Sequence, residues 1–472
     1  MVDVLFLKRH CCANAVLLGT VLALVNGCGS TRSASREAET ARRPASAAPD
    51  SEPEALPASP EQVRATEGAL EHEVTLPAVL RIALARNPEL TEARERVRAA
   101  REAAPAASRL PDPEFEYQLW GQPIAHPVSF DETQMHMFGI RQTFPAPGSL
   151  SARSEAASAQ ASVAAQARRV REQDLVARVR RAYAEYYRAD REYRIHLDHI
   201  RFAQQALDMA RAAYQGGRGT QQDVLRAAVE LSRMHNDVAG VDRDRRTARG
   251  LLNTLMARPA EAPLGPPAPI RADKVQLRAD ELMRLASERR PEIAAAQSAI
   301  RARESELDAA RATGRWPSFM VGVQYMYMPM EEETQNYGVT FAMSLPWLNP
   351  RYGEEVRAAE ARVAAERSAL SSVRYAARYE AYESVERLKA ARESLAIIER
   401  DLLPQAQHSF ESAQAVYRGG QADSLALFDA LRSLLDVKLE RERALLRIET
   451  ALADMERAIG GPVSSSQQRE EK

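Results

Sequence analysis

Two uninterrupted helical patterns constrain the fold of this chain more strongly than any other feature. Each extends over about 65 residues, from Ser149 to Gln215 and from Arg351 to Arg418. At a rise of 1.5 Å per residue, each helix is on the order of 100 Å long, which is more than a globular domain requires. Ala, Arg, Glu and Leu dominate these stretches, as they do in long helices. The chain is therefore predicted to be mainly α-helical.

The sequence is also duplicated, with a period of about 200 residues. The matched pairs are ARNPEL at 85–90 with ERRPEI at 288–293, QTFP at 142–145 with MSLP at 343–346, and YQGG at 214–217 with YRGG at 417–420. Because the matches fall at Pro and Gly positions and in the same order, chance similarity between Ala-rich helices is a weak explanation.

Each half is predicted to contain the same elements in the same order. A first helix, two strands, a Pro-containing joint and the long helix are followed by a Gly pair and a return helix. The first helices are predicted at 75–107 and 275–313, the strands at 114–121, 133–144, 318–328 and 337–345, and the return helices at 220–257 and 423–459.

The strands alternate between an apolar face and a small or polar face, which is typical of membrane β-barrels. In the fourth strand Val339 and Phe341 share the apolar face, while Thr340 and Ala342 share the other. Trp316 and Trp347 flank the second hairpin, as an interfacial aromatic girdle requires. A half-buried soluble sheet would show the same alternation. Four strands cannot close a membrane barrel, and open edges are not tolerated in lipid, so several copies would have to pool their strands.

The first residues resemble a secretory signal that ends in a lipobox. Basic residues at 8–10 precede a short apolar run at 11–25, and Gly27 comes directly before Cys28. Cys28 would be the one cysteine left after cleavage, so we expect it to be lipidated. An ordinary signal peptide with a spare thiol is the alternative. The predicted domains are a signal peptide at 1–27, a lipidated, disordered tether at 28–73, two repeats at 74–263 and 264–461, and a disordered tail at 462–472.

Charge and motifs exclude several other functions. Lys and Arg (64) nearly balance Asp and Glu (65), so the basic surplus of a nucleic-acid-binding protein is missing. There is no phosphate-binding loop, cysteine cluster or Ser-centred elbow, so no catalytic, cofactor or metal site is predicted. His196 and His199 are spaced to share one helix face. Charged neighbours such as Arg194 and Asp198 favour a solvated surface for both.

The duplicated order of these features resembles the TolC family of outer-membrane efflux factors over about 74–461. The stretches at 85–90 and 142–148 and the paired Tyr-x-Gly-Gly turns carry the resemblance. It implies a homotrimer whose pooled strands form a twelve-stranded β-barrel, with the helices continuing as an α-helical barrel across the periplasm. It also implies a passive exit duct in the outer membrane that works with a periplasmic adaptor and an inner-membrane pump and is not an enzyme.

By the same resemblance, the two glycine turns form a periplasmic tip that binds the adaptor. The residues implied are Tyr214, Gly216, Gly217, Gly219, Thr220 and Asp223 in the first turn and Tyr417, Gly419, Gly420 and Asp423 in the second. The second turn departs from the pattern, because Ala426 occupies the place equivalent to Asp223. Ordinary helix caps and turn glycines would account for any one of these residues equally well.

Five methionines are predicted to face the lumen: Met135, Met137, Met326, Met328 and Met330. Thioethers favour Cu(I), so these side chains would offer weak sites for a soft metal; the alternative is that they fill an irregular wall. The stretches at 110–113 and 144–148 resemble the heavy-metal branch of the family.

Two other classes of protein remain open, a non-conducting lipoprotein scaffold with long coiled coils and a pump adaptor. Neither explains the duplicated hairpins.

Overall fold

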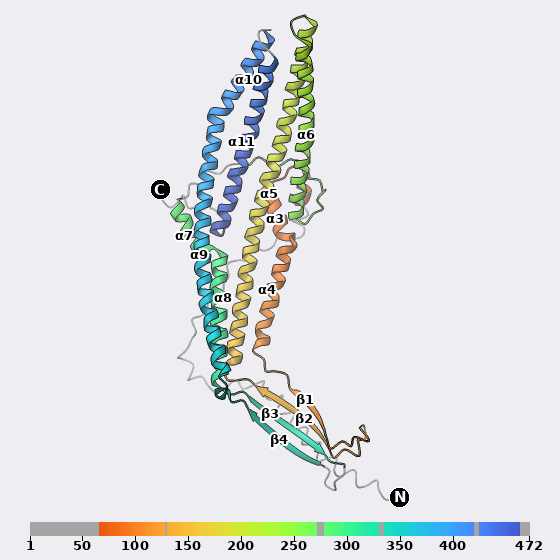
Figure 1. The fold of residues 1–472 in the computed structure, drawn as a ribbon, viewed down its shortest axis with the longest axis vertical. Helices are drawn as coiled ribbons and strands as arrows, with labels where there is room; N and C mark the ends of the chain where they lie inside the picture. Colours follow the sequence, from red (N-terminus) through yellow and green to blue (C-terminus); the bar gives the residue numbers. More distant parts are fainter. Residues whose placement is uncertain (1–65, 128–129, 271–277, 330–334, 420–423, 463–472) are drawn as a thin grey trace. The chain divides into compact units, whose positions relative to one another are not determined.

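The computed structural model describes residues 66–127, 130–270, 278–329, 335–419 and 424–462, and it is largely helical (Figure 1). The first half contains α3 (Leu76–Arg86), α4 (Pro88–Ala107), β1 (Glu114–Trp120), β2 (Met135–Phe144), α5 (Ser149–Gln215) and α6 (Gln221–Leu255). The second contains α7 (Ala279–Arg289), α8 (Pro291–Arg315), β3 (Phe319–Tyr327), β4 (Gln335–Met343), a 3₁₀ turn (Pro346–Leu348), α9 (Arg351–Ile397), a π turn (Ile398–Leu402), α10 (Leu403–Arg418) and α11 (Ser424–Ile459). The predicted signal, Cys28, most of the tether, Met330, Gly420 and Asp423 lie outside the described residues.

The first helix of each half is two helices, where the sequence pattern predicted one. Asn87 and Arg290 have extended backbones, with ψ of 125° and 124°, and each precedes a proline that opens the next helix. The proline ring disfavours the helical conformation at the residue before it, while its own fixed φ suits the first helical position. Asn87 also caps α4, since its side chain accepts a hydrogen bond of 2.9 Å from the Glu89 N–H.

The long helices agree closely with the prediction. The bounds of α5 are those predicted from the sequence, and its counterpart in the second half is interrupted only by the π turn between α9 and α10. Pro404 lies in the first turn of α10, directly after that π turn. Pro404 has no N–H to donate and its ring crowds the preceding turn, and the π turn lets the helix continue through this position.

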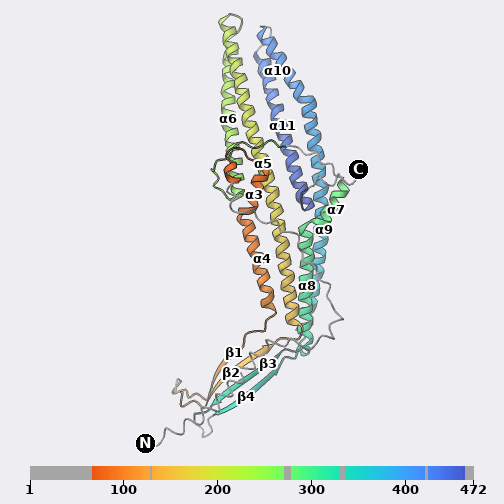
Figure 2. The same cartoon turned by 180° about the vertical axis from the view of Figure 1, so that it is seen from behind.

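The described helices form two rows that share part of α5 (Figures 1 and 2). In the row connected to the sheet, α4 packs on α5, α5 on α8, and α8 on α9. In the other row, α6 packs on α5, α5 on α11, and α11 on α10. The largest fully buried side chains of these contacts include Ile82, Leu175, Leu252, Leu427, Leu431 and Ile448.

Two tyrosines of α5 tie non-helical backbone to the helix row. The Tyr183 hydroxyl lies 3.0 Å from the carbonyl oxygens of Val74 and Ala268, to which it can donate, and Tyr186 donates to Gly265 over 2.9 Å. Burial raises the pKa of Tyr183, which keeps its hydroxyl protonated as a donor. The segments on either side are joined by a parallel bridge between Val74 and Pro267. The two tyrosine hydroxyls therefore hold the segments at Val74 and at 265–268 against α5 through hydrogen bonds.

The four strands make one antiparallel sheet in the order β1–β2–β3–β4, so the contact between β2 and β3 joins the two halves. Phe115, Ile140, Val323 and Val339 are direct partners across the sheet and share one face. This confirms the predicted alternation. Within the described residues, the outer edges of β1 and β4 have no partner strand. None of the described helices combines the length and the apolar character needed to cross a bilayer.

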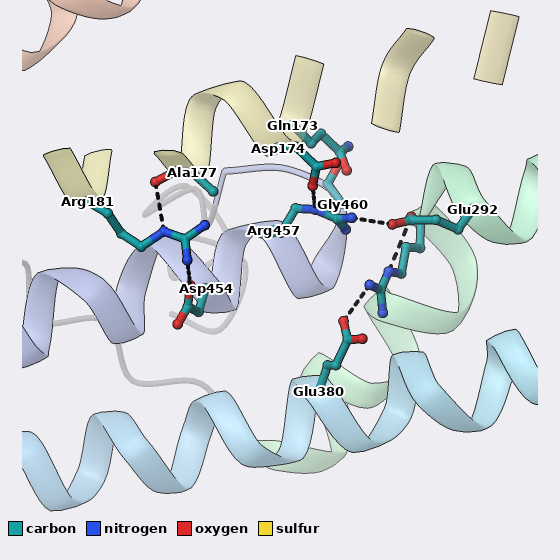
Figure 3. A network of polar contacts seen from close by, with 10 residues as sticks. Gln173, Asp174, Ala177, Arg181, Glu292, Glu380, Asp454, Arg457 and Gly460 are labelled. Carbon is teal, nitrogen blue, oxygen red and sulfur yellow. Dashed lines mark hydrogen bonds and ion pairs between the residues drawn. The ribbon is translucent and has the colours of Figure 1, made fainter. Parts of the chain in front are cut away.

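A charged junction lies where α5, α8, α9 and α11 come together (Figure 3). Glu292 forms ion pairs with Arg290 at 3.2 Å and with Arg457 at 2.5 Å. Arg457 also pairs with Asp174 of α5, and the buried Arg290 pairs with Glu380 of α9. Arginine and carboxylate therefore alternate from α5 through α11 and α8 to α9, which ties the two halves together.

Candidate functional site

The apolar face of the sheet is exposed over all four strands. Phe115 is 70% exposed and Val339 is 68% exposed, and Tyr337, Phe341 and Ile140 are similarly open. A contiguous exposed apolar surface of this size is uncommon on a soluble monomer and marks an interaction with membrane or protein. The face is therefore suited to lipid.

Both exposed tryptophans of the second hairpin lie at its helix end, as predicted. Trp316 ends α8, and Trp347 lies in the 3₁₀ turn after β4. Ser318 N–H donates to Ser344 Oγ over 2.8 Å, and Ser344 N–H donates to the Ser318 carbonyl over 3.0 Å, so the two chain segments meet. This arrangement fits an aromatic belt at one membrane interface.

The opposite face of the sheet carries charge and sulfur. Arg141 pairs with Glu114 at 2.5 Å and with Glu116 at 3.3 Å. Met137 of β2 lies directly opposite Met326 of β3, and Met135 follows Met137 on the same face. Met328 comes directly after β3, while Met320, which the sequence analysis did not include, shares the face. The structure thus brings Met135, Met137 and Met326 together on the polar side.

His136 is a sheet residue that the sequence analysis missed. Its ring is buried, with Nε2 2.8 Å from the Phe130 carbonyl and Nδ1 2.8 Å from the Tyr117 hydroxyl. Because a carbonyl can only accept, Nε2 carries the proton and Nδ1 accepts from Tyr117. His136 thereby fastens the connection between β1 and β2 to the sheet. In the sequence, this role is indicated by the presence of a histidine at a position where the strand alternation calls for an apolar residue.

The first glycine turn closes α5 onto α6 with little freedom. Gly217 has a φ of +69°, and a Cβ at Gly219 would meet backbone atoms of Ala213 and Tyr214 at 3.2–3.3 Å. Thr220 and Asp223 form a capping box: Asp223 N–H donates to Thr220 Oγ1 over 3.2 Å, and Thr220 N–H donates to Asp223 Oδ2 over 3.0 Å. The neighbouring Tyr214 is half-exposed, and Gly216 caps the C-terminus of α5.

Asp223 also contacts the first residue of α11. Ser424 at the start of α11 donates a hydrogen bond of 2.6 Å to Asp223 Oδ1. The hydrogen bonds from Ser424 and then Thr220 lower the pKa of Asp223, so the carboxylate stays ionised. Further along, Arg432 of α11 pairs with Glu230 of α6 at 2.6 Å. Near the end of α10, Tyr417 is the penultimate helical residue, and Gly419 caps the helix with its N–H donating to the Ala415 carbonyl over 3.1 Å. No pattern in the sequence indicates Ser424 or Arg432 as a partner of α6.

The prediction of a solvated surface for His196 and His199 is wrong. His199 is 0% exposed and His196 is also buried, because α6 and α11 pack on this part of α5. Burial, with Lys438 of α11 and His196 adding to it, lowers the pKa of His199 to about 4, so the ring is neutral. Within the described ranges, no group of three or more His, Cys, Asp or Glu residues is placed to hold a metal ion.

An exposed apolar sheet, joined to very long helices that end in glycine turns, defines a membrane channel component of the outer-membrane type. A family model described as outer membrane efflux protein matches the chain twice, at residues 79–258 and 282–461. No curated protein sequence matches the chain. The chain belongs to the outer membrane efflux protein family.

Solved structures of membrane proteins share the fold. The channel-forming CusC matches with a TM-score of 0.71 at 19% identity, covering 82% of this chain and 92% of that one. The MtrE channel of Neisseria gonorrhoeae gives 0.69 at 20%, covering 82% and 89%, and VceC of Vibrio cholerae gives 0.67 at 18%, covering 82% and 97%.

Membership of this family establishes the general role of the protein. It is the outer-membrane channel component of a tripartite efflux system, extends into the periplasm and works with an adaptor and an inner-membrane pump. Proteins of this family are channels and not enzymes.

Proposed function

We propose that the protein acts as a homotrimeric exit duct whose pooled strands form a twelve-stranded barrel. The observation that carries the proposal is the sheet, which combines an exposed apolar face with outer edges at β1 and β4 that no other described strand pairs with. Unpaired backbone groups are too costly in lipid, so the edges of one copy must pair with those of the next. Substrate would then pass through the polar side of the sheet without further chemistry.

Conductance in a planar bilayer tests this assignment directly. The purified full-length protein should give discrete openings in steps of one size, and its mass in detergent should correspond to three copies. A non-conducting scaffold, which has the same long helices, would give no current. An intact trimer without conductance would favour the scaffold.

The proposed domain plan adds a lipid anchor to the channel. Residues 1–27 would be removed, Cys28 would carry the lipid, residues 28–73 would link it to the repeats at 74–263 and 264–461, and 462–472 would form a tail. The signal-like N-terminus and the lack of another cysteine after Cys28 support this plan.

Replacement of Cys28 by Ser is expected to abolish labelling with a fatty-acid analogue. The barrel should still insert, so the variant should remain partly in the outer-membrane fraction. Labelling is measured by gel fluorescence of the immunoprecipitated protein. Equal labelling of the variant and the wild type would rule out Cys28 as the anchor.

We also propose that the two glycine turns form the tip that binds the adaptor. The residues are Tyr214, Gly216, Gly217, Gly219, Thr220, Asp223, Tyr417, Gly419, Gly420 and Asp423. Support comes from the half-exposed Tyr214 and from the hydrogen bond between Ser424 and Asp223, which brings the first turn to the start of α11. An adaptor that binds here would contact both helical hairpins.

Replacement of Gly217 by Leu should abolish pump-dependent resistance while the trimer persists. A side chain at a φ of +69° costs about 1–2 kcal/mol and reshapes the turn. The matched control is Gly240→Leu on α6, where a Cβ would meet nothing within 4 Å beyond the adjacent backbone of its own helix. Resistance is read as the minimum inhibitory concentration in cells that carry the cognate pump. If Gly217→Leu matched the control, the turn would not be the docking site.

A soft metal ion is a second candidate for the cargo. The direct pairing of Met137 with Met326, with Met135 on the same face, favours it. Thioethers in register would offer transient Cu(I) sites along the polar side. Leucine in place of all five methionines nearly keeps the volume. Unchanged growth of that variant on copper and silver would show that the methionines only fill the wall and bind no metal.

A further inference from the structure

His199 is a buried polar side chain that the exit duct does not use. Its ring lies on α5 where α6 and α11 pack on this helix, and it is 0% exposed. Within the described residues neither of its ring nitrogens has a hydrogen-bond partner, and Nδ1 of the neighbouring His196 has none either. Folded proteins leave few buried polar atoms unpaired, because each one weakens the fold. A leucine would fill this place without that cost, so the imidazole ring calls for another explanation.

The ring of His199 lies between two helical hairpins. One hairpin is α5 with α6, the other is α10 with α11, and they meet mainly through α5 and α11 (Figure 1). His199 is edge-on to Phe202 at 5.9 Å between ring centroids, and Phe202 is edge-on to Phe410 of α10 at 5.6 Å. Leu435 and Leu439 of α11 are buried in the same contact between α5 and α11. A change at His199 therefore acts on the packing of one hairpin against the other.

Opposite charges join the hairpins on either side of this level. Nearer to the glycine turns, Arg432 of α11 pairs with Glu230 of α6 at 2.6 Å. Nearer to the other end of α11, Arg443 pairs with Glu192 of α5 at 3.7 Å. At the level between these pairs, α11 brings a cation, Lys438, close to the histidine ring of α5. A proton on that ring would therefore place two positive charges across the contact.

Charged groups on all three helices act on the two histidines: Asp198 and Glu192 of α5, Asp237 of α6 and Lys438 of α11. The acids favour the charged ring, but burial outweighs them. At His199, burial, then Lys438 and His196, lowers the pKa from its ordinary value of 6.5 to about 4. Burial also lowers the pKa of His196, where Asp237 and Glu192 oppose it. His199 is therefore the ring whose protonation the packed helices resist most.

The direction of the pH effect follows from this difference. When the hairpins part, water reaches the His199 ring and its pKa returns toward 6.5. Above pH 6.5 the ring is neutral in both arrangements, so pH has no effect. Between pH 6.5 and 4 the parted arrangement binds a proton that the packed arrangement does not, which favours parting. Below pH 4 both bind it, and the shift of the equilibrium levels off at on the order of a hundredfold.

We propose that His199, with Lys438 opposite it, is an acid-sensitive switch that loosens the α10–α11 hairpin from α5. At neutral pH the uncharged ring packs among apolar side chains. In acid, an imidazolium and an ammonium group face each other in a buried contact, which is costly unless the helices separate and admit water. The switch lies within one chain, so it does not depend on the proposed trimer.

Hydrogen exchange of the α11 backbone tests the switch in the full-length protein in detergent. A helix that loses its packing frays, because isolated helices are marginally stable in water. Exchange of residues 431–440 is measured by mass spectrometry at pH 7 and pH 5, and each rate is divided by the intrinsic rate at that pH. The wild type should exchange about tenfold faster at pH 5 on this scale.

His199→Leu is the main variant, since leucine is similar in size and cannot be protonated. Its normalised exchange should be equal at the two pH values. The matched control is His235→Leu at an exposed histidine of α6, which should respond to acid as the wild type does. Lys438→Met keeps the histidine and removes the opposing cation, so its acid response should be several-fold smaller than that of the wild type.

Three outcomes would overturn the switch. The wild type could exchange equally at both pH values, His199→Leu could respond as strongly as the wild type, or Lys438→Met could show an undiminished response. The last outcome decides the question even if His199→Leu does not fold. None of these measurements requires current through a bilayer, so a lack of conductance would count against the proposed duct alone.

Discussion

Replacement of Val339 by Lys is expected to destabilise the folded barrel by about 2–4 kcal/mol, the cost of a lipid-facing charge near the membrane midplane. Val339 is the central residue of β4 and pairs with Val323 on the apolar face. Its side chain is largely exposed in the single chain, so the loss would not come from a disrupted protein core. The cost arises because the ammonium group must leave water or distort the bilayer.

The matched control for this prediction is Thr340→Lys, one residue further along the same strand. Thr340 pairs with Gly322 on the polar face, so its replacement should cost much less. Both variants are refolded into lipid vesicles, and the urea midpoint is read from the gel mobility of unboiled samples. Equal midpoints for the two variants would mean that neither face contacts lipid.

The strands and long helices were predictable because they depend on local patterns. Alternation gave each strand to within about two residues, and the bounds of α5 follow from an unbroken helical pattern between a Pro-Gly joint and a Gly pair. The breaks at Asn87 and Arg290 were missed although each precedes a proline. The apolar spacing continues across both breaks, so periodicity alone predicts one helix, while the residue before each proline is kept out of the helical conformation.

Contacts between distant segments were not predictable from one sequence. Ser424 and Asp223 are 201 residues apart, and Arg457 and Asp174 are 283 residues apart. Periodicity indicates which side of a helix is apolar, but it does not say which helix covers a polar residue. The same limit explains the error at His199, whose charged neighbours suggested solvent while α6 and α11 bury it.

A conservative substitution in the charged junction should therefore lower the free energy of unfolding of the helices strongly. Replacement of Glu292 by Gln is expected to lower the free energy of unfolding by about 2–3 kcal/mol, because the nearly buried Arg290 and the partly buried Arg457 both lose their shared carboxylate. The partial exposure of Glu292 keeps the value below that of a fully buried pair.

Glu288→Gln is the matched control, since the pair that Glu288 forms among the described residues is an exposed one with Arg284 at 3.0 Å. Such a pair contributes at most about 1 kcal/mol. Unfolding of the detergent-solubilised protein is followed by the helical circular dichroism signal in guanidinium chloride. Combining Glu292→Gln with Arg457→Met should cost less than the sum of the two single losses, because each removes the same contact. Strict additivity would show that Glu292 and Arg457 do not act as a pair.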